Sequence, residues 1–254
     1  MKYLEDLHQK KIFHKNDVVE FIKNNNTAKE ILRRYKKQNY ISQVRRDLYV
    51  VNDLANKTSL VNKFEIASNI TPSSCIAYHA ALEYHGIAHQ IFYQMYVSSK
   101  EKFNNFDYEG INYIFCQSVS DIGIVNPFTD SLIRITDLER TVIDCINRID
   151  LCGGLEELVQ CFAIITYINE NKLVEYLQHF DKQVLYQKTG FILSYFQKEM
   201  RLSDDFFALC KFKMGRSTRY LTDNKEFNTF FPEWRLCAPK NILSFLEQGG
   251  TVYV

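Results

Sequence analysis

Basic side chains recur at short spacing between residues 27 and 46, and they are the groups in this sequence best suited to chemistry. Guanidinium and ammonium groups neutralise phosphates, while hydroxyl and amide groups bond to base edges. Between Lys23 and Arg46 the only acidic residue is Glu30, against eight basic residues, whereas a merely solvated surface usually mixes both signs. This run predicts a nucleic-acid interface. The candidate contacts are Thr27, Lys29, Arg33, Arg34, Lys36, Lys37, Gln43, Arg45 and Arg46.

Three short helices are predicted to position these side chains. The first amphipathic stretch has Leu4 and Leu7 on one face and is followed by Ile12-Phe13, and the second opens near Asn16. The third helix is expected to begin at Thr27, because Thr27 and Glu30 form a T-x-x-E capping box. The side chains predicted to face the core from this helix are Ala28, Ile31, Leu32 and Tyr35.

Residues 41–51 follow this helix and predict a two-stranded ribbon, because apolar positions alternate on each side of a polar turn. Three short helices followed by a ribbon are typical of a winged helix-turn-helix. The third helix would enter a major groove with its N-terminal turn toward base edges. Arg45 and Arg46 on the wing would reach phosphates or a minor groove. We therefore expect a DNA-binding domain over residues 1–52.

The rest of the chain, residues 53–254, predicts a larger domain of opposite charge. Residues 1–52 contain 12 Lys or Arg against 6 Asp or Glu, which leaves 19 against 24 for the body. Its pattern predicts a mixture of strands and amphipathic helices, one of which opens at a second capping box, Thr136 with Glu139. Arg140 and Asp144 are expected to pair on that helix at i, i+4 spacing. The predicted fold class is α+β, an N-terminal winged helix-turn-helix followed by a larger mixed α/β domain.

Catalytic signatures are absent from the sequence. There is no GxxxxGK phosphate loop, GxSxG elbow, HExxH or GxGxxG motif, and no Gly-Ser pair before a DxD pair of a nucleotidyltransferase centre. The cluster of His79, His85 and His89 does not share one helical face, and the seven cysteines are scattered without a CxxC pair. We therefore expect no metal, no cofactor and no enzymatic activity, and we interpret the cysteines as reduced core residues.

Membrane association is also not expected from the sequence. No apolar run approaches the roughly 20 residues that a membrane helix requires, and neither end of the sequence has the pattern of a signal peptide. Together with the scattered cysteines, this predicts a cytoplasmic protein.

Four segments carry a resemblance to a known family. They are RRDLYV at 45–50, YHAALEYHG at 78–86, and TDLERTVIDC at 136–145 followed by GGLEE at 153–157. Together they resemble the AbiEi-type antitoxins and transcriptional regulators associated with abortive infection, and the resemblance covers most of the chain. Asp47 stands where the family commonly has Gly, although Asp tolerates a left-handed turn better than most residues.

The resemblance implies a DNA-binding transcriptional repressor and antitoxin of a type IV toxin–antitoxin system that acts in phage defence. Such a protein binds double-stranded promoter DNA and negatively autoregulates its operon. Its C-terminal domain, here residues 53–254, counters a separately encoded nucleotidyltransferase toxin. The residues themselves fix neither the toxin partner nor the oligomeric state.

Two other hypotheses stay open from the sequence. The chain would be a stand-alone enzyme acting on nucleic acid if a deep pocket gathered at least two of His79, Glu83 and Asp137, because an acid or base must reach the reacting proton. It would be an interaction scaffold if the N-terminal domain bound protein, in which case charge reversal at Arg33 and Arg34 would leave DNA affinity unchanged.

Overall fold

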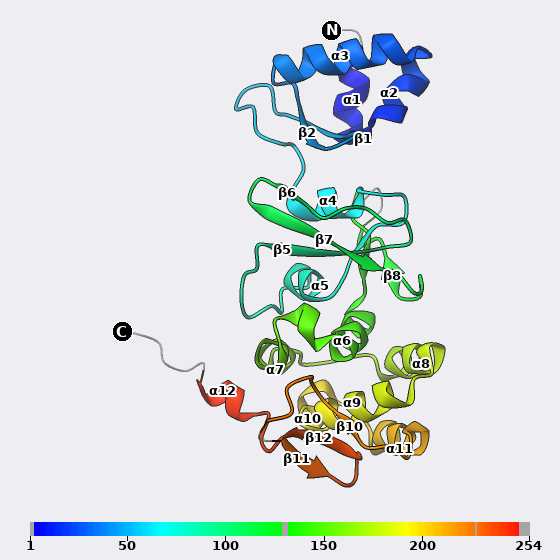
Figure 1. Ribbon diagram of the computed structural model, residues 1–254, viewed down its shortest axis with the longest axis vertical. Helices are drawn as coiled ribbons and strands as arrows, with labels where there is room; N and C mark the ends of the chain where they lie inside the picture. Colours follow the sequence, from blue (N-terminus) through cyan, green and yellow to red (C-terminus); the bar gives the residue numbers. More distant parts are fainter. Residues whose placement is uncertain (1–2, 129–131, 227, 249–254) are drawn as a thin grey trace. The chain divides into compact units, whose positions relative to one another are not determined.

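The architecture is mixed α+β, as predicted, in a computed structural model that describes residues 3–128, 132–226 and 228–248 (Figure 1). The chain divides into two compact units. The first comprises Met1–Ile76, Tyr93–Val119 and Asn126–Arg134, and the second comprises Ala77–Phe92, Ser120–Val125 and Ile135–Val254. The boundary expected at residue 52 lies inside the first unit, so a separate domain over residues 1–52 stays a prediction.

The N-terminal part of the first unit contains the three predicted helices and the predicted ribbon. A strand that was not predicted, β1, lies between the first two helices, and Ile12 and Phe13 belong to it. It makes an antiparallel sheet of order β1-β3-β2. The elements are α1 (Leu4–Lys10), β1 (Ile12–His14), α2 (Lys15–Ile22), α3 (Asn25–Lys37), β2 (Ile41–Arg45) and β3 (Leu48–Val51).

Helix α3 buries the face that its sequence pattern predicts. Apolar residues spaced three and four apart lie on one side of a helix, and here they pack against α1, α2 and the sheet. The buried residues of this core are Leu4, Leu7, Phe13, Val18, Ala28, Ile31, Leu32, Tyr35, Ile41 and Val51.

The remainder of the first unit is built on a mixed sheet. Its strands lie in the order β6-β7-β5-β4, in which β5 and β7 are parallel and the other neighbours antiparallel. The elements are α4 (Lys63–Ser68), β4 (Cys75–Ile76), β5 (Gln94–Ser99), β6 (Phe106–Tyr108) and β7 (Ile111–Gln117).

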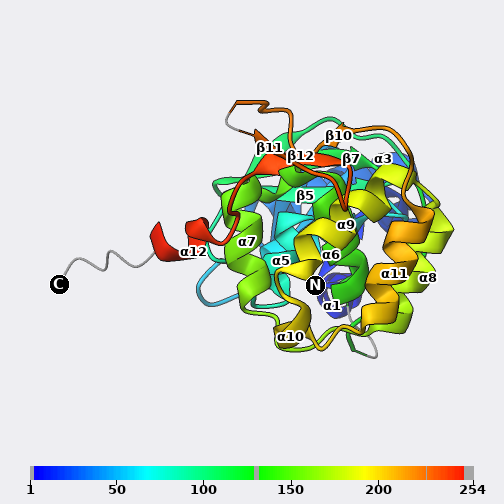
Figure 2. The same cartoon turned by 90° about the horizontal axis from the view of Figure 1, so that it is seen from below.

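The second unit is mainly helical. Its central helix α6 packs against α5, α8 and α9, and a three-stranded sheet of order β10-β12-β11 packs against α9 (Figure 2). The elements are α5 (His79–Tyr84), β8 (Ile124–Val125), β9 (Ile135–Thr136), α6 (Leu138–Asn147), a 3-10 turn (Ile149–Cys152), α7 (Leu155–Ala163), α8 (Glu170–Phe180), α9 (Gln183–Ser194), α10 (Gln197–Met200), α11 (Asp204–Lys213), β10 (Arg219–Tyr220), β11 (Asn228–Phe231), β12 (Leu236–Pro239) and α12 (Ser244–Gln248).

One close approach in this unit requires a glycine. Gly190 lies inside α9, and the ring of Trp234 packs directly over its Cα, where any Cβ would collide with the indole. The side chain of Trp234 is thereby buried between α9 and α11, where it also contacts Phe207. Among the described residues, no helix is both long and apolar enough to cross a membrane.

Candidate nucleic-acid interface

Helix α3, which carries most of the candidate contacts, begins earlier than predicted. Its N-cap is Asn24, whose side-chain oxygen accepts hydrogen bonds from the backbone N–H groups of Asn26 (3.0 Å) and Thr27 (3.1 Å). The prediction that Thr27 caps the helix is therefore wrong. Asn is at least as good an N-cap as Thr, and the first available cap in the polar run is the one used. Thr27 remains exposed in the first turn of the helix.

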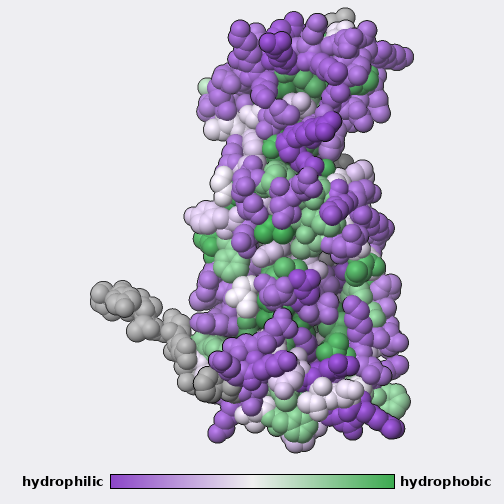
Figure 3. Space-filling model, viewed as in Figure 1, coloured by the Kyte–Doolittle hydropathy of each residue, from purple (hydrophilic) through white to green (hydrophobic). Residues whose placement is uncertain are grey.

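The exposed face of α3 borders a hollow of the first unit, which we call the basic hollow. Four of its cations, Lys29, Arg33, Lys36 and Lys37, follow one another at i, i+4, i+7 and i+8 and so form one stripe. The surface over α3 is almost wholly hydrophilic in Figure 3. The residues that line the basic hollow are Lys15, Lys29, Leu32, Arg33, Lys36, Lys37, Gln43 and Tyr49, with no carboxylate among these described residues.

Gln43 was predicted as a contact, and the structure brings it to the same stripe. The Lys36 ammonium donates a hydrogen bond to the Gln43 side-chain oxygen over 2.8 Å, so strand β2 is tied to α3 across the basic hollow. Arg34 does not line the hollow, because it lies about 100° further round the helix than Arg33. Its guanidinium lies 5.3 Å from the ring centre of Tyr35.

Lys15 and Tyr49 complete the basic hollow and were not predicted. Lys15 is the first residue of α2, and its backbone N–H donates to the carbonyl of Asp47 over 2.9 Å. That bond joins the start of α2 to the turn between β2 and β3. The sequence signal that would have placed Lys15 is strand β1 immediately before it, which was not recognised.

The two arginines of the ribbon, Arg45 and Arg46, lie in different surroundings. A bulge interrupts β2 between Gln43 and Arg45, so Arg45 does not continue the regular alternation of the strand. Its guanidinium lies 5.4 Å and 5.3 Å from the ring centres of Phe103 and Phe106, and burial lowers the pKa of Arg45. Arg45 was expected to reach DNA from the wing, and the structure instead places it against these two rings.

Arg46, by contrast, occupies the exposed turn that follows. Its side chain is 93% exposed and lies 3.6 Å from the Asp47 carboxylate. Asp47 has a φ of 64°, the left-handed conformation expected at this position of the turn. Arg46 is thus the cation that this turn presents to solvent.

His79, a candidate for catalysis, is a buried packing residue in the second unit. Its ring is fully buried, stacks on Phe92 with a centroid distance of 3.9 Å, and lies 3.1 Å from the Glu157 carboxylate. The same carboxylate accepts bonds from the Cys161 thiol (3.3 Å) and from the backbone N–H of Gln90 (2.9 Å). Burial acts to raise the pKa of Glu157, but these donors outweigh it and the pKa is lowered. Burial raises the pKa of the Cys161 thiol well above its usual range.

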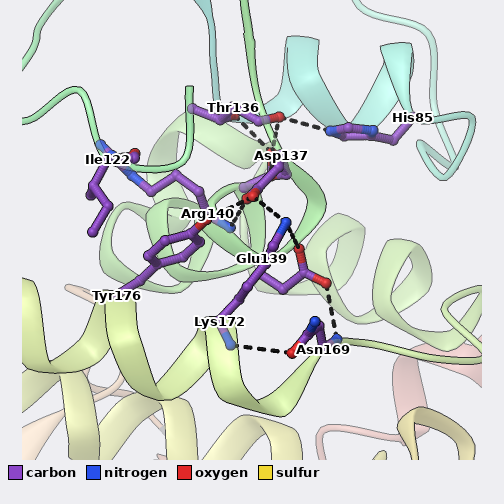
Figure 4. A network of polar contacts seen from close by, with 10 residues as sticks. His85, Ile122, Thr136, Asp137, Glu139, Arg140, Asn169, Lys172 and Tyr176 are labelled. Carbon is purple, nitrogen blue, oxygen red and sulfur yellow. Dashed lines mark hydrogen bonds and ion pairs between the residues drawn. The ribbon is translucent and has the colours of Figure 1, made fainter. Parts of the chain in front are cut away.

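Asp137, the other candidate acid, holds the start of α6 (Figure 4). One of its oxygens accepts the backbone N–H of Arg140 (2.9 Å), and the other accepts from Lys172 Nζ (2.9 Å) and Tyr176 OH (2.7 Å). Asp137 is therefore the N-cap, and the prediction of a Thr136–Glu139 capping box is wrong. Glu139 instead accepts the backbone N–H of Asn169.

Asp137 shifts the pKa values of the two side chains that donate to it, Lys172 and Tyr176. The hydrogen bond to Asp137 raises the pKa of Lys172. Burial, followed by the hydrogen bond to Asp137, raises the pKa of Tyr176. With both oxygens occupied by donors, Asp137 is held as a structural group. His79 and Asp137 are thus anchored in separate contacts, which gives no support to a shared catalytic centre.

Metal ligation was not expected. Within residues 3–128, 132–226 and 228–248, no group of three or more His, Cys, Asp or Glu side chains could hold a metal ion. Six of the seven cysteines are buried, as their interpretation as core residues required, and Cys237 is half-buried.

Comparison with known proteins adds a structural likeness only. No family model matches the chain, and no curated protein matches it in sequence. The fold is similar to the crystal structure of the RV2827C protein from Mycobacterium tuberculosis, with a TM-score of 0.66 and 9% sequence identity. The likeness covers 98% of this chain and 94% of that chain. At this identity it is the fold, and not the function, that the two proteins are shown to share.

Proposed function

We propose that the chain is a DNA-binding transcriptional repressor that contacts double-stranded promoter DNA through the basic hollow. The observation that carries the proposal is the stripe of Lys29, Arg33, Lys36 and Lys37, joined by Lys15 and free of carboxylates among the lining residues. Phosphate neutralisation by such a stripe supplies affinity, since each contact releases counterions. The element order α1-β1-α2-α3-β2-β3, with a sheet of order β1-β3-β2, supports a winged helix-turn-helix over this segment.

In this proposal α3 is the recognition helix. Its N-terminal turn presents Thr27 and Lys29, which are exposed and directed away from the core, to base edges in a major groove. The rest of the stripe contacts phosphates, and Arg46 at the turn between β2 and β3 reaches the neighbouring backbone. Arg45, stacked on Phe103 and Phe106, contributes to the stability of the unit and not to DNA contacts.

The antitoxin half of the proposal is supported by the sequence resemblance. We propose that the protein is cytoplasmic, represses its own operon, and counters a nucleotidyltransferase toxin encoded beside it. Co-expression with a neighbouring nucleotidyltransferase tests this half by growth. Unrelieved toxicity, with both proteins present at equal levels, would refute it without bearing on DNA binding.

The repressor half is tested by binding to the DNA upstream of the gene across a salt series. For Arg33→Ala/Lys36→Ala we expect weaker binding. We also expect the salt slope, which is the slope of log affinity against log salt concentration, to be shallower by roughly two, because each lost phosphate contact reduces it by about one. The matched control is Lys57→Ala/Lys102→Ala, which removes two exposed cations of the same unit outside the basic hollow. An unchanged slope in the first variant, or an equal change in the control, contradicts the proposal.

The two arginines of the ribbon provide a second comparison in the same assay. Arg46→Ala should reduce the salt slope by roughly one. Arg45→Ala should leave the slope unchanged and lower the free energy of unfolding by about 1 kcal/mol, the scale of a partly desolvated cation–π contact. The reverse result would mean that Arg45 leaves Phe103 and Phe106 to contact DNA.

A further inference from the structure

A second concentration of positive charge lies in the second unit, in a chain segment that the proposed function does not use. Residues 211–240 carry seven Lys or Arg against three Asp or Glu, whereas the rest of residues 53–254 carries twelve against twenty-one. The segment forms the end of α11 and the sheet β10-β12-β11. Four of its cations are exposed and follow one another without an intervening carboxylate, namely Lys211, Lys213, Arg216 and Arg219.

The outer face of this sheet carries an exposed aromatic row. Tyr220 pairs with Cys237 across β10 and β12, and Phe230 pairs with Cys237 across β11 and β12. Paired residues share one face of a sheet, so the three side chains form a row, which we call the aromatic sheet face. Tyr220 is 43% and Phe230 48% exposed, whereas Leu236, on the opposite face, is fully buried in the core.

Cations lie near both ends of these strands, although Arg219 itself pairs with Leu236 and so belongs to the opposite face. At one end the backbone N–H of Arg219 donates to the carbonyl of Arg235 (3.1 Å), and the Arg235 side chain donates to the carbonyl of Gly215 (3.4 Å), next to Arg216. At the other end Lys225 Nζ lies 5.1 Å from the ring centre of Tyr220. The three carboxylates of the segment lie in the connections between strands: Asp223, Glu226 and Glu233.

We propose that the aromatic sheet face binds single-stranded nucleic acid. Exposed aromatic rings stack on unpaired bases, and bordering cations neutralise the phosphates that link them. Tyr220 and Phe230 lie two strands apart, about 10 Å, which leaves room for one base on each ring. A duplex keeps its bases inside the stack, so it offers these rings nothing to stack on. Stacking accepts any base, so binding has little sequence preference.

The test uses the full chain and fluorescein-labelled oligonucleotides of fifteen deoxythymidines or fifteen uridines, with affinity measured by anisotropy. Tyr220→Ala/Phe230→Ala is expected to weaken binding about tenfold or more, the scale of lost base stacking. Tyr220→Phe/Phe230→Tyr keeps both rings and should stay within about twofold of wild type. Tyr167→Ala removes a ring elsewhere in the unit that is 58% exposed, more than either ring of the row, and is the control. A preference between the two oligonucleotides identifies the kind of strand.

The variant Arg33→Ala/Lys36→Ala distinguishes this inference from the proposal of duplex binding. It should keep oligonucleotide affinity within about twofold of wild type while it weakens promoter binding. Oligonucleotide binding that survives Tyr220→Ala/Phe230→Ala overturns the inference, and so does binding lost in the α3 variant alone. Equal competition by duplex DNA or by polyglutamate also overturns it, because neither presents unpaired bases. None of these results alters the promoter measurement, so the two proposals fail independently.

Discussion

The ion pair inside α6 allows a quantitative test of how this fold uses charge. Arg140 Nε lies 2.9 Å from both carboxylate oxygens of Asp144, and the two side chains are 4% and 10% exposed. The guanidinium also donates to the carbonyl of Ile122 and lies 4.8 Å from the ring centre of Phe180. Arg148 and Asp150 form a comparably short pair at 2.6 Å in the same unit, but their side chains are 49% and 57% exposed. The two pairs therefore differ mainly in burial.

Asp144→Ala should lower the free energy of unfolding by about 3–5 kcal/mol, because it leaves a buried guanidinium without its counter-charge. Asp150→Ala should cost less than about 1 kcal/mol, since water screens the exposed pair. Both values can be measured by urea denaturation followed by tryptophan fluorescence. Trp234, the only tryptophan in the chain, belongs to the same unit as both pairs.

A double substitution separates the charge from the contact. Burial raises the pKa of Asp144 in spite of the attraction of Arg140, so desolvation of the carboxylate outweighs the gain from pairing. Arg140→Met/Asp144→Leu should therefore lie within about 1–2 kcal/mol of wild type, the residual cost coming from the lost bond to the carbonyl of Ile122. Equal losses for Asp144→Ala and Asp150→Ala would refute the reasoning, as would a double variant no more stable than Asp144→Ala.

Three further predictions follow from individual contacts. Asn24→Ala should destabilise α3 by about 1 kcal/mol and Thr27→Ala by less than about half of that, measured by urea denaturation, because Asn24 alone caps the helix. The pKa of Glu157 is lowered in the folded state, so its contribution to stability is present above the ordinary pKa of about 4.3. That contribution is lost as the pH falls below this value. Glu157→Gln should therefore flatten this part of the curve of unfolding free energy against pH. Gly190→Ala should destabilise by about 1–3 kcal/mol through its clash with Trp234, and a rise in the melting temperature, as helix propensity alone would give, would contradict this packing.

The face of α3 could be predicted from the sequence because one helix carries both parts of the pattern. The apolar residues repeat every three or four positions, so their burial and the exposure of Lys29, Arg33, Lys36 and Lys37 follow from helical geometry alone. No contact from another part of the chain had to be known. The same holds for the Arg140–Asp144 pair, which depends only on i, i+4 spacing within α6.

The features that the sequence did not predict depend on contacts between segments. Strand β1 is three residues long and follows α1 after a single residue, Lys11, which adopts a φ of 60° without a glycine to mark the turn. Pairing with β3 makes it a strand, and that pairing also fixes the position of Lys15. The bulge that redirects Arg45 likewise depends on the register between β2 and β3.

The two capping boxes fail for related reasons. At α6 the predicted cap, Thr136, pairs with Ile124 in the β8–β9 ladder, so its backbone belongs to a strand. The N-cap is therefore one residue later, at Asp137, and the helix begins at Leu138. At α3 the polar run before Thr27 supplies an earlier cap. A T-x-x-E pattern shows that a helix start lies nearby, whereas the turn of the preceding chain decides which residue caps it.

The segments that carry the family resemblance in the second unit are explained by packing. The ring of His85, in the segment 78–86, donates to the carbonyl of Thr136, in the segment 136–145, over 2.8 Å. Asp137, Arg140 and Asp144 are all buried. A substitution that leaves one of these groups unpaired would weaken the unit, so a loss of the proposed antitoxin activity in such a variant would not locate a toxin contact. The toxin contact that we propose would lie on exposed side chains. Loss of the proposed activity in an exposed variant that keeps the wild-type unfolding midpoint is the result that would locate it.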